Sequence, residues 1–328
     1  MLCFDVSITI WIGEGPVQRS ERVSRDLKLR EFRILLTVAQ QGSMAKSAVL
    51  LGISQPAVSK AIRDIENVVG LRLLDRSRHG VEPTAYGRVL VKRGLAIFDE
   101  LKQGVEELEF LADPASGQLR IGSNETMAAG VLPAIIDMMS RQYPRITLQV
   151  AQAVLSETQY RELRERQVDL WFGRIPDPFD QEDLNADILF NDPVAVVAGQ
   201  GHRLARRRKI ELAELMGEAW ILPPRGSLPG GLAERLFGTA GLQLPRAQLT
   251  TMSLHLTCNL LATGRYVAML PRSLLRFNIT NAGLKILSVG LPIQVRPVAI
   301  VTLKNRMQSP IAGLFVDSAR VVAKRLVK

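Results

Sequence analysis

The spacing of apolar residues predicts three short helices near the start of the chain. Apolar side chains recur at helical intervals over residues 27–39 and again over residues 44–51. The third set follows i, i+3, i+4, i+7 spacing and consists of Val58, Ala61, Ile62 and Ile65. Gly42 and Gly52 fall in the two gaps. This order and spacing are typical of a helix-turn-helix.

The third predicted helix has a polar and cationic face. Ser54 is placed to cap it, and the residues off the apolar face include Gln55, Ser59, Lys60 and Arg63. Such side chains can donate hydrogen bonds to base edges and phosphates in the DNA major groove. An ordinary solvated helix face has the same composition, so this helix alone leaves both interpretations open.

A basic turn follows the helices in the segment LRLLDRSRHGVEPT, residues 71–84. Two short apolar segments flank a glycine, which predicts a small hairpin, or wing. Arg76, Arg78 and His79 lie toward its tip, where arginines reach phosphates or a minor groove.

Residues 84–112 predict a single long helix, because they contain no proline and Thr84 can cap it. An approximate heptad seam is formed by Tyr86, Leu90, Ile97, Leu101, Leu108 and Leu111, with Gly94 and Gly104 on the same stripe. About 28 helical residues span roughly 40 Å. A second copy is the expected partner of the stripe, and packing on the same chain is the alternative.

Five motifs between residues 27 and 93 combine into one pattern. They are the Leu-x-x-Phe start, Gly42-Ser43, the helix SQPAVSKAIRDIE, Gly70-Leu71-x-Leu73-Leu74-x-Arg76, and Pro83-Thr84-x-x-Gly87. The pattern resembles the winged helix-turn-helix of LysR-type bacterial transcriptional regulators, with Ser47 departing from the usual Ala. The resemblance and the wing together give the DNA-contact candidates Ser43, Ser54, Gln55, Ser59, Lys60, Arg63, Arg76 and Arg78. It also implies that the long helices pair in a homodimer or homotetramer.

Residues 118–328 predict an α/β domain after a hinge at residues 113–117. Strands are expected at 118–122, 146–150 and 168–172, with helices at 128–141 and 156–166, the order of a parallel sheet. A second set has strands at 194–198, 220–222, 249–250 and 267–270 and helices at 228–240 and 254–263. A strand at 298–303 and a helix at 311–328 end the chain. The fold class is therefore α/β with an all-α winged helix-turn-helix, residues 25–83, in front.

Four further motifs extend the resemblance. They are GSNETMAAGVLP, VDLWFGRIPD, ILPPRGS and LLATGRYVAMLP, and they are similar to the effector-binding part of LysR-type proteins, which resembles periplasmic solute-binding proteins. The resemblance implies two lobes with a ligand cleft between them, lobe I at about 118–190 and 303–328 and lobe II at about 191–302. Crossover strands are expected near residues 188–198 and 296–302.

Loops that follow the predicted strands are candidates for holding an effector, because ligands lie beyond strand carboxyl ends and at helix N-termini. The candidates are Ser123, Asn124, Thr126, Ser156, Arg174, Arg225, Ser227 and Ser253. Thr126, Ser156 and Ser227 could equally be plain helix caps. Glu125 stands where the family often has a small or apolar residue, and an acid there disfavours a carboxylate ligand unless Arg174 or Arg225 offsets it.

Charge locates the expected DNA contact. The formal charge is +10 with a pI near 10.0, which permits a polyanionic partner. Residues 25–93 carry 13 Lys or Arg against 6 Asp or Glu, whereas residues 94–112 carry 1 against 5. The basic excess of the first third therefore surrounds the helix-turn-helix, and the later run at 206–209 is interpreted as a solvated loop.

The sequence disfavours several classes of protein. Cys3 and Cys258 are far apart and lack metal or disulfide spacing, which fits a reducing cytoplasm. No apolar run reaches membrane length, and residues 1–24 are expected to be a poorly ordered leader or an over-long start rather than a signal peptide. Nucleophile-elbow and phosphate-loop motifs are missing and only 3 His occur, so we expect no enzyme, no cofactor and no metal.

The sequence thus predicts a sequence-specific DNA-binding transcriptional regulator controlled by a small-molecule effector of unknown identity. Its expected partners are double-stranded DNA, the effector and a second copy, with RNA polymerase as a further candidate and no membrane. Two alternatives remain open. One is a small-molecule-binding or enzymatic α/β protein without sequence-specific DNA binding; the other is a ligand-free architectural DNA protein, against which the cleft loops argue.

Overall fold

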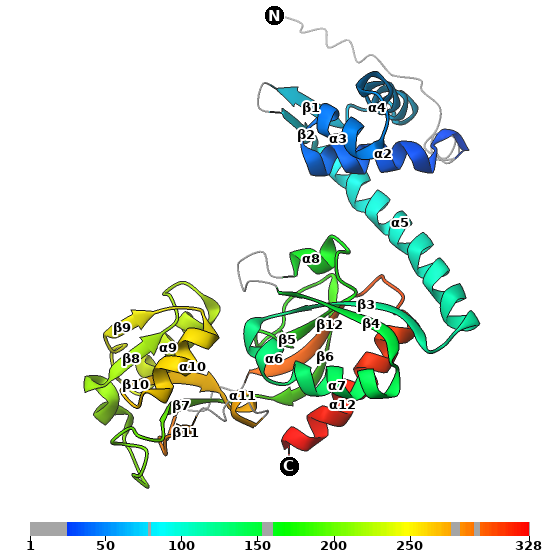
Figure 1. The fold of residues 1–328 in the computed structure, drawn as a ribbon. Helices are drawn as coiled ribbons and strands as arrows, with labels where there is room; N and C mark the ends of the chain where they lie inside the picture. Colours follow the sequence, from blue (N-terminus) through cyan, green and yellow to red (C-terminus); the bar gives the residue numbers. More distant parts are fainter. Residues whose placement is uncertain (1–24, 78–79, 153–159, 277–282, 292–295, 328) are drawn as a thin grey trace, which may run out of the picture. The chain divides into compact units, whose positions relative to one another are not determined.

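The computed structural model describes residues 25–77, 80–152, 160–276, 283–291 and 296–327 (Figure 1). Contacts divide the chain into two compact units, Met1–Glu100 and Leu101–Lys328. The boundary lies inside the long helix α5, Ala85–Ala112. The predicted leader and the candidate residues Arg78, His79 and Ser156 lie outside the described residues.

The first unit contains the predicted helix-turn-helix and wing. Its elements are α2 (Leu29–Gln41), α3 (Met44–Leu51), α4 (Gln55–Val69), β1 (Leu74–Ser77) and β2 (Gly80–Pro83). The two strands pair antiparallel, which confirms the hairpin. The apolar face of α4 is buried as predicted, and its Val58, Ile62 and Ile65 form a core with Leu35 and Val38 of α2. Burial of these stripes is what holds three such short helices together.

Helix caps occur at the predicted residues. Ser43 Oγ accepts the Lys46 N–H at 3.3 Å, and Ser54 Oγ accepts the Ala57 N–H at 3.4 Å. Thr84 Oγ1 accepts the Gly87 N–H at 3.0 Å, so the long helix begins where the sequence predicts.

Gly87 sets how closely α5 can pass the wing. A Cβ built on Gly87 would lie 2.0 Å from the carbonyl oxygen of Leu73. Every residue type other than glycine carries a Cβ and would clash there. Further along α5, Gly94 faces Phe32, whereas an added Cβ on Gly104 would contact nothing within 4 Å.

The first lobe of the second unit is built on a five-stranded sheet of order β4-β3-β5-β12-β6, counted over the described residues. Its strands are β3 (Ser116–Ser123), β4 (Arg145–Gln152), β5 (Leu170–Arg174), β6 (Leu184–Asn191) and β12 (Pro297–Leu303). β4 and β5 run parallel to β3, as predicted for the β-α-β-α-β segment. β12 runs antiparallel to both β5 and β6.

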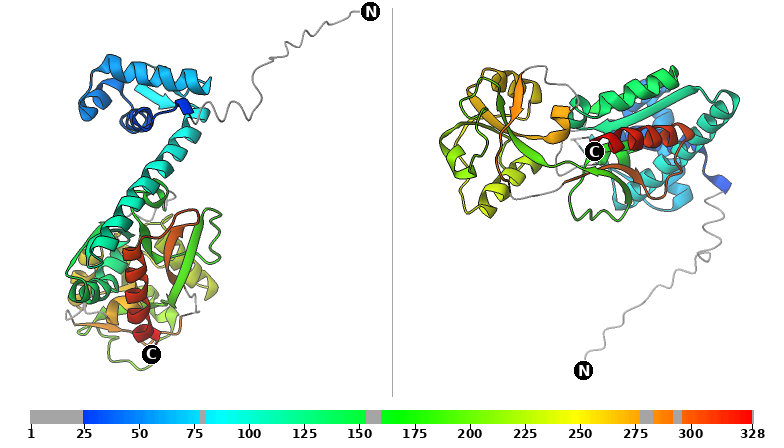
Figure 2. Two further views of the ribbon diagram at one scale, coloured as in Figure 1. Left: turned by 90° about the vertical axis from the view of Figure 1, so that its right-hand side faces the viewer. Right: turned by 90° about the horizontal axis from the view of Figure 1, so that it is seen from below.

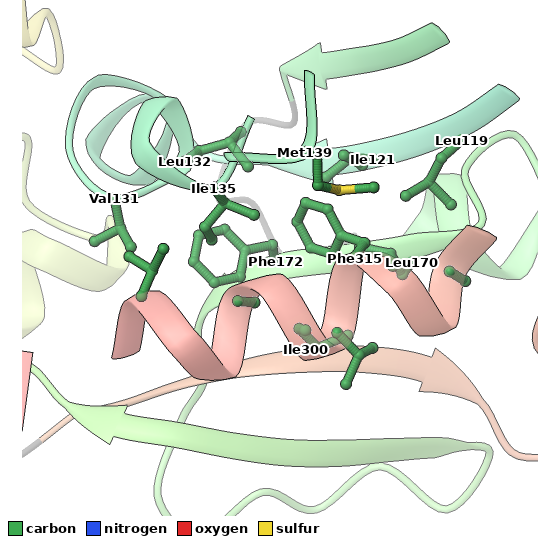
Figure 3. Packing of buried hydrophobic residues seen from close by; sticks show 14 of the residues in the cluster. Leu119, Ile121, Val131, Leu132, Ile135, Met139, Leu170, Phe172, Ile300 and Phe315 are labelled. Atoms are coloured by element: carbon green, nitrogen blue, oxygen red, sulfur yellow. The ribbon is translucent and has the colours of Figure 1, made fainter. Parts of the chain in front are cut away.

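Helices cover this first sheet. They are α6 (Glu125–Ala129), α7 (Leu132–Gln142), α8 (Arg161–Arg164) and α12 (Pro310–Val327). The C-terminal helix α12 packs beside α7 against the sheet (Figures 1 and 2). Figure 3 shows Phe315 of α12 next to Phe172 of β5, with ring centroids 6.2 Å apart and planes at 79°. This edge-to-face pair lies at the centre of the core.

The second lobe has its own five-stranded sheet of order β11-β7-β10-β8-β9 in the described part of the chain. Its strands are β7 (Val194–Gly199), β8 (Ala219–Leu222), β9 (Ala247–Thr250), β10 (Tyr266–Pro271) and β11 (Leu284–Ile286); its helices are η1 (Leu212–Gly217), α9 (Leu228–Thr239), α10 (Leu254–Ala262) and α11 (Arg272–Arg276). β8 pairs parallel with β9 and β10, and β7 pairs antiparallel with β10. Trp220 anchors the core against Phe237.

Three expected boundaries are wrong in detail. The helix expected over 128–141 is two helices, α6 and α7, because Pro133 sits in the first turn of α7. β3 begins at Ser116, inside the expected hinge. β12 pairs in the first sheet, so residues 297–302 lie in lobe I rather than lobe II. The crossover expected near residues 188–198 does lie there, because β6 of the first sheet ends at Asn191 and β7 of the second sheet begins at Val194.

Candidate DNA-binding and effector-binding sites

Helix α4 presents the predicted polar face to solvent. Gln55, Lys60 and Arg63 are exposed, and Ser54 is exposed at the N-cap. Arg76 of the wing donates from Nη2 to Ser59 Oγ at 3.3 Å. The structure therefore brings wing and helix into one cationic surface. We use the name recognition surface for the predicted DNA-contact residues that the structure describes, Ser43, Ser54, Gln55, Ser59, Lys60, Arg63 and Arg76.

Two contacts hold the wing at a fixed position relative to the helices. Glu66, near the end of α4, accepts the Leu73 N–H at 2.8 Å and the Leu74 N–H at 3.3 Å. On the other strand, the Val81 N–H donates to the Gly42 carbonyl at 2.9 Å. Hydrogen bonds to a carboxylate are stronger than neutral ones, so Glu66 is a structural residue of this domain.

The second unit contains a cavity of about 240 Å³ that both lobes line. It lies at the carboxyl ends of strands β3, β8 and β9, where open α/β sheets bind ligands. The first lobe contributes the polar residues Asn124, Glu125, Thr126, Gln152 and Arg174. Much of the opposite wall is apolar and includes Leu222, Leu228, Leu232, Met252 and Leu270. The lining is therefore amphipathic.

Three of the predicted effector residues reach this cavity, namely Asn124, Thr126 and Arg174. Ser123 does not, because its side chain is fully buried and donates to the Phe172 carbonyl at 2.8 Å. Arg225 has 80% of its side chain exposed and lies 3.7 Å from Glu234.

Ser227 and Ser253 also remain outside the lining. Each accepts a backbone N–H as the N-cap of its helix, from Gly230 at 3.1 Å and from Leu256 at 3.3 Å. The plain-cap interpretation describes both of these serines.

Asn124 carries a hydrogen-bond donor without a partner. Its Oδ1 accepts the Met127 N–H at 3.0 Å and the Thr126 hydroxyl at 2.8 Å, which fixes the orientation of the amide. Its Nδ2 is buried, and no group among the described residues accepts from it. A buried unsatisfied donor of this kind carries a desolvation cost.

Arg174 is held by a buried acid. Its Nη2 donates to the Asp192 carbonyl at 2.7 Å and lies 2.8 Å from the Asp192 carboxylate. That carboxylate also accepts the Ser273 N–H at 2.9 Å and hydroxyl at 2.6 Å. The Nε of Arg174 is buried and has no acceptor within the described ranges.

Two cavity residues were missed or misjudged from the sequence. Glu125 was expected to disfavour a carboxylate ligand unless Arg174 or Arg225 offset it; it lines the cavity, and its Oε1 accepts the Leu254 N–H of the other lobe at 3.0 Å. Arg296, which was not a candidate, lines the cavity and is partly buried. Burial, and then the nearby Arg235 and Arg174, lower the pKa of Arg296. No local signal marks Arg296, because it stands just before β12 and reaches the cavity only through the return of the chain to lobe I.

Within the described ranges, no group of three or more His, Cys, Asp or Glu side chains is placed to bind a metal ion. In the same residues, no helix combines the length and the apolar character that crossing a membrane requires.

Two family models match the chain. Residues 29–88 match the model described as bacterial regulatory helix-turn-helix protein, lysR family, and residues 112–323 match the LysR substrate binding domain. The transcriptional regulator GbpR of Azospirillum brasilense is 29% identical over 285 residues, 87% of this chain and 83% of that protein. The regulator YdcI of Escherichia coli is 26% identical over 93% of this chain and 98% of its own length.

Solved structures share the fold. Full-length OxyR from Pseudomonas aeruginosa aligns with a TM-score of 0.67 at 21% identity, covering 91% of this chain and 97% of that one. The LysR family regulator CbnR aligns with a TM-score of 0.61 at 20% identity, covering 90% of this chain and 99% of that one. The matched models cover most of the residues, so the chain belongs to the LysR family of transcriptional regulators, with a DNA-binding helix-turn-helix domain followed by an effector-binding domain.

Proposed function

We propose that this regulator contacts its operator through the recognition surface and responds to a small molecule in the cavity of the second unit. The observation that carries the DNA half is the exposed face of α4, where Gln55, Lys60 and Arg63 lie beside the Arg76 wing contact. Gln55 is proposed to contact base edges, and the two cations to contact phosphate or guanine. The fold shared with CbnR, which has also been solved with its target DNA, supports this assignment. Because it acts on the chromosome, we place the protein in the cytoplasm.

We further propose that two copies pair through α5. Its apolar stripe is exposed in the single chain, with Leu101, Leu108 and Leu111 at 50%, 67% and 72% of their full exposure. A long helix with such a stripe is stabilised when a second helix covers it. Pairing also gives the two half-sites of an operator one recognition surface each.

Effector binding is proposed to act through the two lobes, because residues of both line the cavity. A ligand that contacts both lobes stabilises one relative arrangement over others, and only this differential binding can shift the equilibrium. A change in lobe arrangement is then transmitted through subunit packing to the paired α4 helices.

The DNA half is tested by gel-shift titration with DNA fragments selected by the full chain. Lys60→Ala and Arg63→Ala should each weaken binding by about tenfold or more, since loss of a specific contact costs about 1–3 kcal/mol. Lys285→Ala is the matched control, because Lys285 is exposed on β11 of the second lobe. Unchanged affinity and site preference in both test variants would refute the assignment of α4.

A further inference from the structure

The positive charge of the second unit is concentrated on its second lobe. Residues 194–291 carry 12 Lys or Arg against 4 Asp or Glu, whereas residues 116–192 and 296–327 together carry 13 against 13. The first lobe is therefore neutral, and the second lobe has an excess of eight positive charges. Such an excess attracts polyanions and destabilises the lobe through self-repulsion. Where the cations lie on the lobe decides what they can bind.

The topology of the second sheet brings seven of these cations to one end of the lobe. β7 ends at Gly199, and β10 begins at that same end because it runs antiparallel to β7. β9 also begins there, since β8 pairs parallel with both β9 and β10. The seven cations follow β7 or directly precede β9 and β10, and we call them the basic end: Arg203, Arg206, Arg207, Arg208, Lys209, Arg246 and Arg265.

The loop after β7 touches the start of β10, so these cations share one surface region. A Cβ built on Gly264, the residue before Arg265, would lie 3.1 Å from the carbonyl carbon of Gly201. The cavity lies at the other end of the sheet, where its lining includes Val194 at the start of β7 and Leu270 near the end of β10. The basic end is therefore separate from the proposed effector site.

Four cations of the basic end have no ionic partner among the described residues, and each of them is exposed: Arg206, Arg208, Arg246 and Arg265. The other three form ion pairs, which are Arg203 with Glu218, Arg207 with Glu214, and Lys209 with Glu211. Even within these pairs, Arg203 and Lys209 keep 70% and 86% of their side chains exposed. The basic end thus presents guanidinium groups, which bind phosphate through two parallel hydrogen bonds.

The basic end lacks the apolar centre that a protein interface has. In the described part of the second lobe, the large apolar side chains left exposed are Leu228, Met252 and Leu256. All three follow the carboxyl ends of β8 and β9, at the cavity end of the sheet. Protein interfaces have an apolar core inside a polar rim, and binding to a membrane surface also buries apolar side chains. Arginines without apolar neighbours fit the phosphate backbone of a nucleic acid instead.

From these observations we infer that the basic end binds the phosphate backbone of double-stranded DNA, as a second DNA contact besides the recognition surface. The contact falls on DNA that flanks the operator, because the recognition surface occupies the operator itself. It adds affinity without sequence preference, since every base pair presents the same phosphates. The run at 206–209 resembles a solvated loop when it is considered alone, but the fold adds Arg246 and Arg265 to it. This inference goes beyond the proposed function, which requires only the recognition surface.

Fluorescence anisotropy of the full-length protein with two DNA fragments tests the inference. One fragment is trimmed to the selected operator, and the other extends it by about 20 base pairs, roughly two helical turns, on each side. The double variant Arg206→Gln with Arg208→Gln should bind the extended fragment at least about fivefold more weakly than the unchanged protein does. Its salt slope on that fragment should be smaller by about 2 for each engaged subunit. Both proteins should bind the trimmed fragment alike.

The matched control is Arg225→Gln with Arg272→Gln. It removes the same charge from two exposed arginines of the same lobe, which follow β8 and β10 at the cavity end and do not line the cavity. The control should bind both fragments as the unchanged protein does. An equal loss in the two double variants would show that only net charge matters and would overturn the inference. Unchanged binding of the extended fragment by the Arg206, Arg208 variant would overturn it as well.

Labelled poly-glutamate distinguishes DNA from an acidic protein partner. If the Arg206, Arg208 variant keeps its affinity for the extended fragment but loses affinity for poly-glutamate, the basic end binds an acidic polypeptide and the DNA inference is wrong. Circular dichroism checks that the variant is folded, as its two exposed positions lead us to expect. The proposed function fails on a different result, in which Lys60→Ala and Arg63→Ala leave binding of the trimmed fragment unchanged.

Discussion

At the scale of single residues, Glu125 shows how a tertiary contact changes the meaning of a side chain. In the sequence it is an acid beside a candidate ligand loop, and it argues against an anionic ligand. In the structure its carboxylate accepts a backbone N–H of α10, 129 residues further along the chain. The negative charge is therefore engaged at a helix N-terminus, and it also links the two lobes.

Replacing Glu125 with Gln should lower the stability of the second unit. The neutral amide loses the interaction with the α10 dipole, worth up to about 1 kcal/mol, so the midpoint of the effector-domain transition should fall by roughly 2–4 °C. Scanning calorimetry measures the shift.

Glu182→Gln is the control for that substitution, because Glu182 is exposed and lies outside the cavity lining. It should leave the midpoint unchanged. A Glu125→Gln protein with unchanged thermal stability would show that the negative charge of Glu125 contributes nothing to stability, because the glutamine oxygen can still accept the Leu254 N–H.

The same scale shows why the cavity could be predicted only in part. Asn124, Thr126 and Arg174 were chosen because they lie at or just after strand ends, and all three line the cavity. Ser227 and Ser253 obey the same rule, but their hydroxyls cap their own helices. Capping and ligand binding use the same residue types at the same positions, so sequence alone cannot separate them.

At the scale of elements, local signals predicted most of the helices and their starts. Ser43, Ser54 and Thr84 cap the helices that were expected to begin there. The segment 128–141 was wrongly predicted as one helix because its apolar spacing continues through Gly130. The helical backbone stops there, and a new helix begins at Leu132. A Cβ on Gly130 would lie 2.9 Å from the Thr126 carbonyl oxygen and 3.5 Å from the Leu274 Cα, so another helix approaches closely at the break.

The exposed apolar stripe of α5 leads to a prediction about the oligomeric state. A double change, Leu101→Lys with Leu108→Lys, places two charges where the proposed partner helix packs, and burying them there is strongly unfavourable. The chain should then sediment as a monomer at concentrations where the unchanged protein is a dimer or tetramer. Both leucines are exposed in the single chain, so its fold should be retained, which circular dichroism checks.

Glu109→Lys is the matched control on the same helix. Glu109 is exposed but carries a charge already, and the stripe does not include it. This variant should keep the oligomeric state of the unchanged protein. If the double variant also stays oligomeric, α5 is not the pairing element.

At the scale of the whole molecule, the order of strands was beyond the reach of the sequence. The parallel set β3, β4 and β5 follows from alternation of strands and helices. The return of β12 between β5 and β6 depends on a pairing across more than a hundred residues, and nothing in its seven residues specifies the partners. Arg296 was missed for the same reason. It directly precedes β12 in the chain, so its place in the cavity lining depends on where β12 pairs.

If the protein binds DNA as a dimer, the salt dependence of its affinity should reflect the contacts of both subunits. If each subunit places Lys60, Arg63 and Arg76 on phosphates, a dimer makes six such contacts, and the logarithm of its affinity should fall with the logarithm of salt concentration at a slope of roughly −5. The monomeric Leu101→Lys, Leu108→Lys protein carries an intact recognition surface, so its slope should be about half of that value. Fluorescence anisotropy with labelled operator DNA from 50 to 200 mM salt, about the range over which such slopes are measured, provides the comparison. Equal slopes for the two proteins would mean that one recognition surface accounts for all the phosphate contacts, and pairing through α5 would then have no part in DNA binding.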